Sequence, residues 1–231
     1  MVSELNATET LQTDFISNVS HEFKTPISAI EGYASLLQEH QQSPEEQAEY
    51  IDKILFNTRR LSALAGNILL LSKLDSQSIH PQRSCFRLDE QVRQCILALE
   101  RKWTEKDVDF DVDLDSVDFT GYEGLLQHVW MNLIDNAVKY NRPGGHVYIT
   151  VCHDAHRAYF TVRDTGIGIP EDKQDRIFER FYRADSSRSR KISGTGLGLA
   201  IVKHIVEQHH GTIRLKSKEN EGTEITVSLP L

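Results

Sequence analysis

Apolar residues in the first third of the chain recur at alternating intervals of three and four. They occupy positions 16, 19, 23, 26, 30, 33 and 37, and again positions 50, 54, 57, 61, 64, 68 and 71, with Pro26 and Asn57 as the departures. This is the spacing of helices with one apolar seam. The intervening Ser43-Pro44-Glu45-Glu46 supplies an N-cap, a first-turn proline and a capping-box acid. Residues 1 to about 76 are therefore predicted to form a helical hairpin.

The seam of such a hairpin needs a partner surface. Two helices cannot cover it by themselves, so a second copy that closes a dimeric four-helix bundle is the simplest solution. We predict a homodimer through these helices. The alternative is a hairpin that packs on the rest of its own chain.

After the polar residues 75–78 the apolar pattern changes to period two. Alternating segments at 108–114, 146–152, 158–164 and 224–229, with a short segment at 212–217, predict strands, and helical spacing returns at 89–101, 122–140 and 197–210. The short connections at 152–158 and 217–223 predict antiparallel hairpins. The expected fold class is α+β in two domains: the helical hairpin at 1–78 and an α/β sandwich at 79–231, with helices on one sheet face.

Composition narrows the class of protein. With 39% hydrophobic and 26% charged residues the chain is typical of soluble globular proteins, and it has neither an apolar run of eighteen residues nor a signal peptide at its start. We expect a cytoplasmic protein, joined to a membrane only through segments absent from this chain. A net charge of −8 without a basic run argues against nucleic-acid binding.

Cysteine and histidine usage gives little evidence of a metal site. Cys85, Cys95 and Cys152 are far apart, so neither a disulfide framework nor a zinc site is predicted. Most histidines are scattered, and the pair His209–His210 precedes Gly211 at a predicted helix end. We interpret this pair as solvated or capping residues.

His21 is a candidate nucleophile on the first helix. If Val19 and Phe23 belong to the seam, His21 points outward, with Glu22 beside it and Thr25 one turn on. Pro26 clashes with the carbonyl of residue 22, so a bend is expected there. An exposed imidazole next to an acid suits nucleophilic chemistry, although an ordinary surface histidine fits the same pattern.

Two glycine-rich runs and one helix predict a phosphate site in the second half. The runs are "DTGIGIP" (164–170) and "GTGLGL" (194–199), and neither matches a P-loop or the dinucleotide fingerprint. In "NLIDNAVKY" (132–140), Asn132 and Asn136 share a helical face with Lys139 nearby. Amide oxygens are hard ligands suited to magnesium, and glycines let a backbone approach phosphate.

Five segments in this order resemble the catalytic core of bacterial sensor histidine kinases of two-component systems. They are "FISNVSHEFKTPISAI" (H box), "NLIDNAVKY" (N box), "DTGIGIP" (G1 box), "RIFERFYR" (176–183, F box) and "GTGLGL" (G2 box). The resemblance covers nearly the whole chain. It implies a dimerisation and phosphotransfer hairpin followed by an ATP-binding domain of the Bergerat type. The implied activity is ATP-dependent autophosphorylation of a histidine, transfer to an aspartate of a response regulator, and dephosphorylation of that regulator.

The resemblance also implies roles for single residues. It makes His21 the phosphoacceptor, Glu22 the acid that orients and deprotonates its ring, Thr25 the residue that places a water for dephosphorylation, and Asn136 the ligand of Mg²⁺. Asp164 would accept the adenine amino hydrogen, and 184–193 would be a lid. The full set of implied ATP-binding positions is Asn132, Lys139, Tyr140, Asp164, Gly166, Gly168, Arg183, Gly194, Thr195, Gly196, Leu197 and Gly198.

Two other functions stay open at this point. An ATP-hydrolysing machine of the gyrase or Hsp90 type would share the nucleotide pocket. Those ATPases resemble one another in having a glutamate that activates water four residues before the magnesium asparagine. This chain has Asn132 at that position, which disfavours hydrolysis. A non-catalytic docking module would need only the helices. The segment 75–85 is the expected hinge between kinase and phosphotransfer states.

Overall fold

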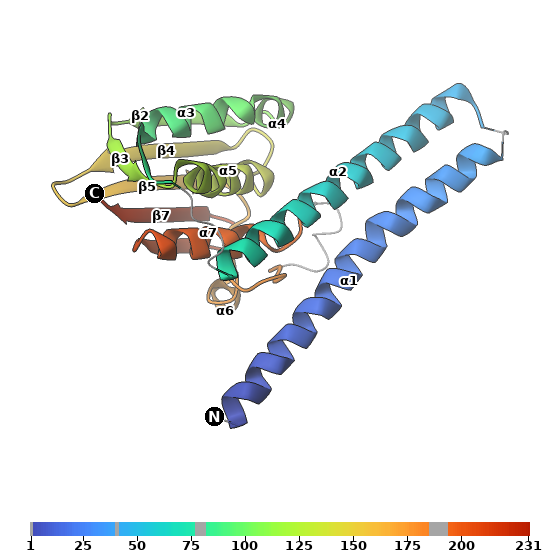
Figure 1. Cartoon of the computed structure of the whole chain (residues 1–231). Helices are drawn as coiled ribbons and strands as arrows, with labels where there is room; N and C mark the ends of the chain where they lie inside the picture. The colour runs from blue at the N-terminus through green and yellow to red at the C-terminus, as the bar shows by residue number, and fades with distance from the viewer. Residues whose placement is uncertain (1, 40–41, 77–81, 185–193) are drawn as a thin grey trace. The chain divides into compact units, whose positions relative to one another are not determined.

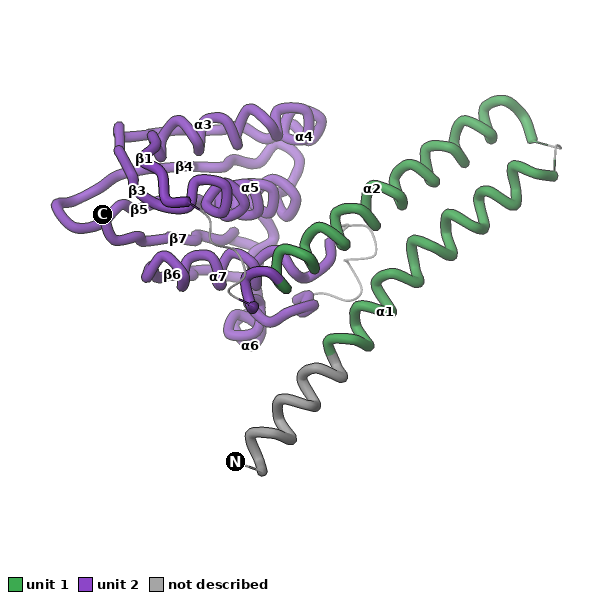
Figure 2. The backbone as a smooth tube through the Cα atoms, viewed as in Figure 1, with its two compact units in different colours: residues 1–72 green, residues 73–231 purple. Residues whose placement is uncertain are grey.

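The computed structural model describes residues 2–39, 42–76, 82–184 and 194–231, with side chains from residue 15 onward. It divides into two compact units, residues 1–72 and 73–231 (Figure 2). The two-domain organisation, a helical hairpin followed by a sheet with helices, agrees with the prediction. The boundary at residues 78 and 79 stays a prediction. Most of the proposed lid (185–193) and part of the proposed hinge (77–81) lie outside the described residues.

The first unit is the predicted hairpin. Helix α1 (Val2–Gln38) continues through Pro26, and α2 begins at Pro44 and ends at Asp75 (Figure 1). The capping box forms as expected: the Glu46 N–H donates to Ser43 Oγ at 3.2 Å, and the Ser43 N–H donates to Glu46 Oε2 at 2.8 Å. Tyr33 and Tyr50, both seam residues, place their ring centroids 5.7 Å apart. The heptad pattern therefore identifies the faces that the two helices turn toward each other.

The second unit is a five-stranded sheet with helices on one face and a small two-stranded sheet. Its elements are β1 (Ser84–Arg87), α3 (Leu88–Ala98), α4 (Glu100–Glu105), β2 (Asp109–Leu114), β3 (Asp118–Gly121), α5 (Glu123–Lys139), β4 (His146–His153), β5 (Arg157–Asp164), α6 (Glu171–Gln174), α7 (Gly198–Gln208), β6 (Thr212–Lys218) and β7 (Gly222–Pro230). The large sheet has the order β2-β4-β5-β7-β6, with β2 parallel to β4 and the other pairs antiparallel. Helix α5 contacts both α3 and α7, and the three helices cover one sheet face (Figure 1).

The core lies between those helices and the inner face of the sheet. Val147, Ile149 and Val151 alternate along β4 as buried residues, and Trp130 of α5 places its ring centroid 4.6 Å from that of Phe160 on β5. Both predicted hairpins are present, β4–β5 and β6–β7. Three features were missed: the β1–β3 pair, the single turn α6, and the break at residue 99 that divides the helix predicted at 89–101.

Strand β2 lies at one edge of the large sheet. Asp109, Asp111 and Asp113 alternate along it and are all exposed, while Phe110 and Leu114 are half-buried and Val112 is exposed. Charges on an edge strand discourage pairing with another chain. The three aspartates therefore oppose pairing of β2 with a strand of another chain.

His209 is a buried residue at the C-cap of α7, so the capping alternative of the expected pair is confirmed and the solvated one does not apply to His209. Its side chain is 6% exposed, its Nδ1 lies 2.8 Å from the Ile205 carbonyl oxygen, and its Nε2 accepts the Tyr122 N–H at 3.1 Å. These two bonds assign the proton to Nδ1. Burial lowers the pKa of His209, so the ring is neutral at pH 7.

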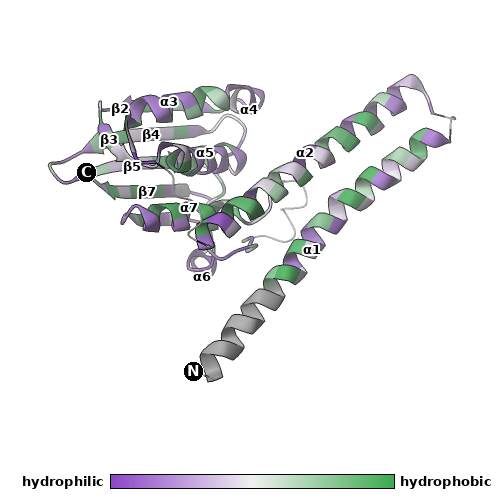
Figure 3. Cartoon of the chain, in the orientation of Figure 1, coloured by the Kyte–Doolittle hydropathy of each residue, from purple (hydrophilic) through white to green (hydrophobic). Residues whose placement is uncertain are grey.

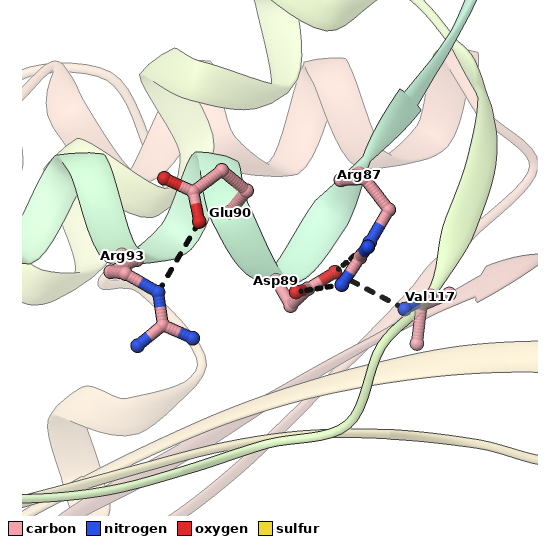
Figure 4. Close-up of polar contacts among 5 residues, drawn as sticks. All are labelled: Arg87, Asp89, Glu90, Arg93 and Val117. Atoms are coloured by element: carbon pink, nitrogen blue, oxygen red, sulfur yellow. Dashed lines mark hydrogen bonds and ion pairs between the residues drawn. The ribbon is translucent and has the colours of Figure 1, made fainter.

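Asp89 fastens the start of α3 to the segment before β3 (Figure 4). Its carboxylate accepts Arg87 Nε at 2.9 Å, Arg87 Nη2 at 2.7 Å and the Val117 N–H at 3.2 Å. The hydrogen bond from Arg87 holds the pKa of Asp89 below its usual range. A carboxylate whose pKa is lower in the folded state contributes stability that is present above its unfolded pKa and lost as the pH falls.

Asp89→Ala is therefore expected to lower the free energy of unfolding by about 1–3 kcal/mol at pH 7, because the Val117 N–H loses its acceptor. The difference from wild type should shrink below about pH 4, where the wild-type carboxylate becomes protonated. Urea unfolding at both pH values measures this. The control is Glu90→Ala, since the exposed Glu90–Arg93 pair (3.3 Å; Figure 4) should contribute less than about 0.5 kcal/mol. A pH-independent loss at Asp89 would contradict the assignment.

None of the helices in the described part of the chain combines the length and apolar character that a membrane span requires.

Candidate ATP-binding site and phosphoacceptor helix

Helix α5 presents the polar residues that the N box predicts. Asn132, Asn136 and Lys139 are half-exposed on a helix whose other face is buried. Asn132 Nδ2 donates to the His128 carbonyl at 2.7 Å, which fixes the amide and turns its Oδ1 away from the backbone. That oxygen lies next to Gly198, where an added Cβ would be 2.6 Å away. The N box and the G2 box are therefore neighbours in space.

The start of the G2 loop lies over the end of the same helix. Lys139 Nζ is 4.7 Å from the centroid of the Tyr140 ring, a cation–π distance. A Cβ on Gly194 would collide with Lys139 Nζ and approach the Tyr140 hydroxyl to 3.8 Å. The backbone at Gly194 therefore lies beside the Lys139 ammonium, and a larger residue there would require that flexible side chain to move.

In the rest of the G2 loop the backbone lies close to the F-box segment and leads directly into α7. Gly196 has φ +70°, and its carbonyl accepts the N–H of Phe181, itself at φ +63°, at 2.9 Å. Leu197 is fully buried, and the Leu197 N–H donates to Thr195 Oγ1 at 3.4 Å before α7 begins at Gly198. An N-terminal helix end with nearby glycines is an environment that favours phosphate.

Asp164 is the last residue of β5 and the first residue of the G1 run. Its Oδ1 accepts the Gly166 N–H at 2.8 Å and the Thr223 N–H at 3.3 Å, which leaves the carboxylate a second oxygen. The residue is 9% exposed, and burial raises the pKa of Asp164 to about 6 despite the two N–H donors. Such a carboxylate suits an amino group that itself needs a buried acceptor.

Both glycines of the G1 run lie close to the backbone of other segments. A Cβ on Gly166 would collide with the Tyr140 carbonyl oxygen, and one on Gly168, at φ +64°, would collide with that of Lys218. The Ile167 N–H donates to the Tyr140 carbonyl at 3.1 Å. The G1 and N boxes are thus joined through the backbone of residue 140. Arg183 is half-buried and follows Phe181.

The side chains along α5 and the glycine loops carry the kinds of donor atom that a magnesium–nucleotide complex requires. The described part of the chain holds no cluster of three or more histidine, cysteine or carboxylate groups that could bind a metal alone. Magnesium usually keeps several waters and takes few protein ligands beside phosphate oxygens. One amide oxygen, from Asn136, with a lysine and glycine loops for the phosphates is consistent with that behaviour.

The hairpin holds the predicted phosphoacceptor on its surface. His21 is exposed, and its ring makes no hydrogen bond to any residue for which the structure describes side chains. Thr25 is also exposed and its hydroxyl donates to the His21 carbonyl at 3.3 Å. Glu22 is bound across the hairpin by Arg60, with Nη2 to Oε2 at 2.9 Å.

The N, G1 and G2 boxes thus come together in the second unit, while the H box lies on the first. Sequence reasoning missed three contributors: Arg60, Phe181 and Thr223. Phe181 could have been singled out within "RIFERFYR", but its positive φ has no sequence signal. Arg60 and Thr223 act from elements 38 and 59 residues distant from their partners.

These features define a class of protein: a nucleotide-binding sandwich joined to a histidine-bearing helical hairpin. Two family models match accordingly, "His Kinase A (phospho-acceptor) domain" over residues 11–77 and "Histidine kinase-, DNA gyrase B-, and HSP90-like ATPase" over residues 121–231. The sensor-like histidine kinase SenX3 of Mycolicibacterium smegmatis is 35% identical over 233 residues, covering 99% of this chain and 60% of SenX3. The chain belongs to the sensor histidine kinase family.

Solved structures agree on the fold. Histidine kinase AdeS of Acinetobacter baumannii superposes with a TM-score of 0.75 at 24% identity, covering 91% of this chain and 97% of AdeS. Full-length ShkA, crystallised in complex with AMPPNP, gives a TM-score of 0.70 at 27% identity over 96% of this chain and 45% of ShkA. The chain spans about 60% of the length of SenX3, the curated relative described above.

Proposed function

We propose that this chain is the catalytic core of a sensor histidine kinase that autophosphorylates His21 from ATP and passes the phosphoryl group to an aspartate of a cognate response regulator. One observation carries the proposal: a phosphoacceptor-domain match and an ATPase-domain match occur in one chain, with an exposed histidine on the first. The proposed setting is the cytoplasm, in agreement with three free cysteines.

The nucleotide would bind along α5 and the G2 loop. Asp164 would accept the adenine amino hydrogen on its second oxygen, and Gly166 and Gly168 would let the backbone line the base. Lys139, Tyr140, Arg183 and the segment from Gly194 to Gly198 would hold the phosphates. Asn132 and Asn136 face the same region, and Asn136 would be the ligand of Mg²⁺. The bound ion would neutralise phosphate charge, and the chain supplies position and further positive charge.

The reaction at the hairpin needs an uncharged imidazole. One ring nitrogen of His21 attacks the γ-phosphorus while the bond to the bridging oxygen of ADP breaks. The proton on the other ring nitrogen passes to the Glu22 carboxylate, so charge does not accumulate on the ring. The N–P bond so formed is the donor for the regulator.

The dimer is part of the proposal. Apolar residues lie along both hairpin helices (Figure 3). Those with large exposed side chains are Ile16, Ile27, Leu36, Ile51, Leu55, Phe56 and Leu69. A single copy rarely exposes so many large apolar side chains on one element. A second hairpin would cover such a surface in a four-helix bundle.

The test is incubation with Mg²⁺ and γ-labelled ATP, followed by acid or alkali. We expect label that survives alkali and disappears in acid, because a phosphoramidate is acid-labile. His21→Gln should retain less than about 1% of the label, since glutamine offers no ring nitrogen, whereas the exposed control His156→Gln should label normally. Equal labelling of His21→Gln would overturn the proposal.

Thr25→Ala is expected to separate the two activities toward the regulator. Autophosphorylation should stay within about twofold of wild type, and dephosphorylation of the phosphorylated regulator should fall about tenfold or more, because only the water reaction needs the hydroxyl. The matched control is Thr58→Ala, whose hydroxyl makes the same bond within α2, to the Ile54 carbonyl at 2.9 Å. Normal dephosphorylation by Thr25→Ala would remove Thr25 from the mechanism.

A further inference from the structure

Glu22 and Arg60 form a partly buried ion pair between the two helices of the hairpin. Arg60 Nη2 lies 2.9 Å from Glu22 Oε2, and the side chains are 21% and 26% exposed. The Lys53–Glu49 pair on the same hairpin differs: its atoms are 3.8 Å apart and its side chains are 48% and 65% exposed. Exposed pairs of the second kind contribute little, whereas a short, shielded guanidinium–carboxylate contact fixes geometry.

The pair restricts a side chain that would otherwise be mobile. A glutamate has three rotatable bonds, and ordering such a side chain costs conformational entropy. Arg60 supplies the order from α2, where its backbone is held in the middle of a helix. It engages Oε2, so the carboxylate keeps a second oxygen for another donor.

In the proposed reaction the ring proton of His21 passes to the Glu22 carboxylate. The His21 ring makes no hydrogen bond to any residue with a described side chain, Glu22 included, so the transfer requires the second oxygen to be free to receive the proton. An activated nucleophile is recognised by a base that a third group orients in turn. The Arg60–Glu22 contact supplies the third group and the base, and the proposed reaction adds His21 as the nucleophile.

We propose that Arg60 is a positioning residue for autophosphorylation. It touches neither ATP nor the reacting nitrogen; it holds the Glu22 carboxylate so that the free oxygen receives the ring proton of His21 as the N–P bond forms and ADP departs. This inference rests on the proposed function. It adds a group on the second helix to the phosphoacceptor machinery of the first.

The experiment measures the initial rate of autophosphorylation against ATP concentration for Arg60→Gln and Arg60→Lys, each with Glu22 and with Glu22→Gln. Arg60→Gln should lower kcat about tenfold and leave the KM for ATP within about twofold, because ATP binds to the other domain. Arg60→Lys should recover about half of the lost rate or more. On the Glu22→Gln background, Arg60→Gln should cost less than about a further twofold, since the two residues act as one unit.

Controls separate positioning from folding. Lys53→Gln should have no effect on the rate, and Arg60→Gln should keep the wild-type helix content and dimer mass. Wild-type rate in Arg60→Gln, a raised KM, or a full tenfold loss on top of Glu22→Gln would each overturn the positioning role. Absence of label on the wild-type protein would instead overturn the proposed function itself.

Discussion

Asp164→Asn is expected to lower the affinity for ATP about 100-fold or more while making the ATP-free protein more stable. The affinity falls because an amide replaces a charged acceptor and brings an N–H₂ group toward the adenine amino group. Loss of a charge-assisted hydrogen bond with a buried donor left unmatched amounts to about 3 kcal/mol, or about two decades in Kd. Calorimetric titration with magnesium and ATP measures this directly.

The gain in stability follows from the raised pKa. Because the pKa of Asp164 is about 6 in the folded state, above its unfolded value near 4, the folded chain holds this proton more tightly. The cost of burying the carboxylate therefore grows as the pH rises from about 4 to 6 and is complete above that range. Asparagine avoids it and can still accept the Gly166 N–H, so the free energy of unfolding at pH 7.5 should rise by about 1–3 kcal/mol.

The same pKa predicts a pH dependence of binding. Protonation of Asp164 below about pH 6 removes the acceptor, so wild-type affinity for ATP should fall with decreasing pH, and the variant should lack that component. The control is Asp172→Asn, an exposed acid in the first turn of α6, which should change neither affinity nor stability. An Asp164→Asn protein that binds ATP normally would place the adenine elsewhere.

Trp130→Ala is expected to lower the free energy of unfolding of the second unit by about 3–5 kcal/mol. The indole is fully buried, packs on Phe160, and donates from Nε1 to Gln91 Oε1 at 2.8 Å, so it joins α5 to both α3 and the sheet. Truncation leaves a cavity and an unsatisfied amide oxygen. Urea unfolding followed by circular dichroism gives the value.

Two further variants test whether the loss of stability in Trp130→Ala comes from the packing of that ring in the core or would follow the loss of any tryptophan. Trp130→Phe keeps most of the apolar area and should cost only about 1–3 kcal/mol, largely from the missing donor. Trp103→Ala removes a half-buried ring that packs on Phe110, and its cost should be well below that of Trp130→Ala. Equal losses at positions 103 and 130 would show that α5 is not the centre of the core.

Sequence patterns predicted those parts of the fold that depend on local periodicity. Helix α5 was expected at 122–140 and lies at 123–139, and the capping box at Ser43 forms with both bonds. The β1–β3 pair was missed because each strand has four residues and their partners are over thirty positions apart, so neither shows a period. The parallel pairing of β2 with β4 has no local signal either.

The candidate site shows the same division. Asn132, Asp164 and the glycines stand in contiguous motifs, so their types and spacing suffice to predict them. The environment that raises the pKa of Asp164 comes from tertiary burial, and the Arg60–Glu22 contact joins two helices. Neither can be derived from spacing along the chain.

Dimerisation would give the acidic edge of β2 a further consequence. Two catalytic domains tethered to one helical bundle share an effective concentration in the millimolar range, far above that of free protein in solution. Unpaired strand edges at that concentration would meet often and could pair through backbone hydrogen bonds into one continuous sheet. Asp109, Asp111 and Asp113 give each copy the same negative charge along that edge, so two such edges repel. The tether can then keep both domains near the phosphoacceptor without fusing them.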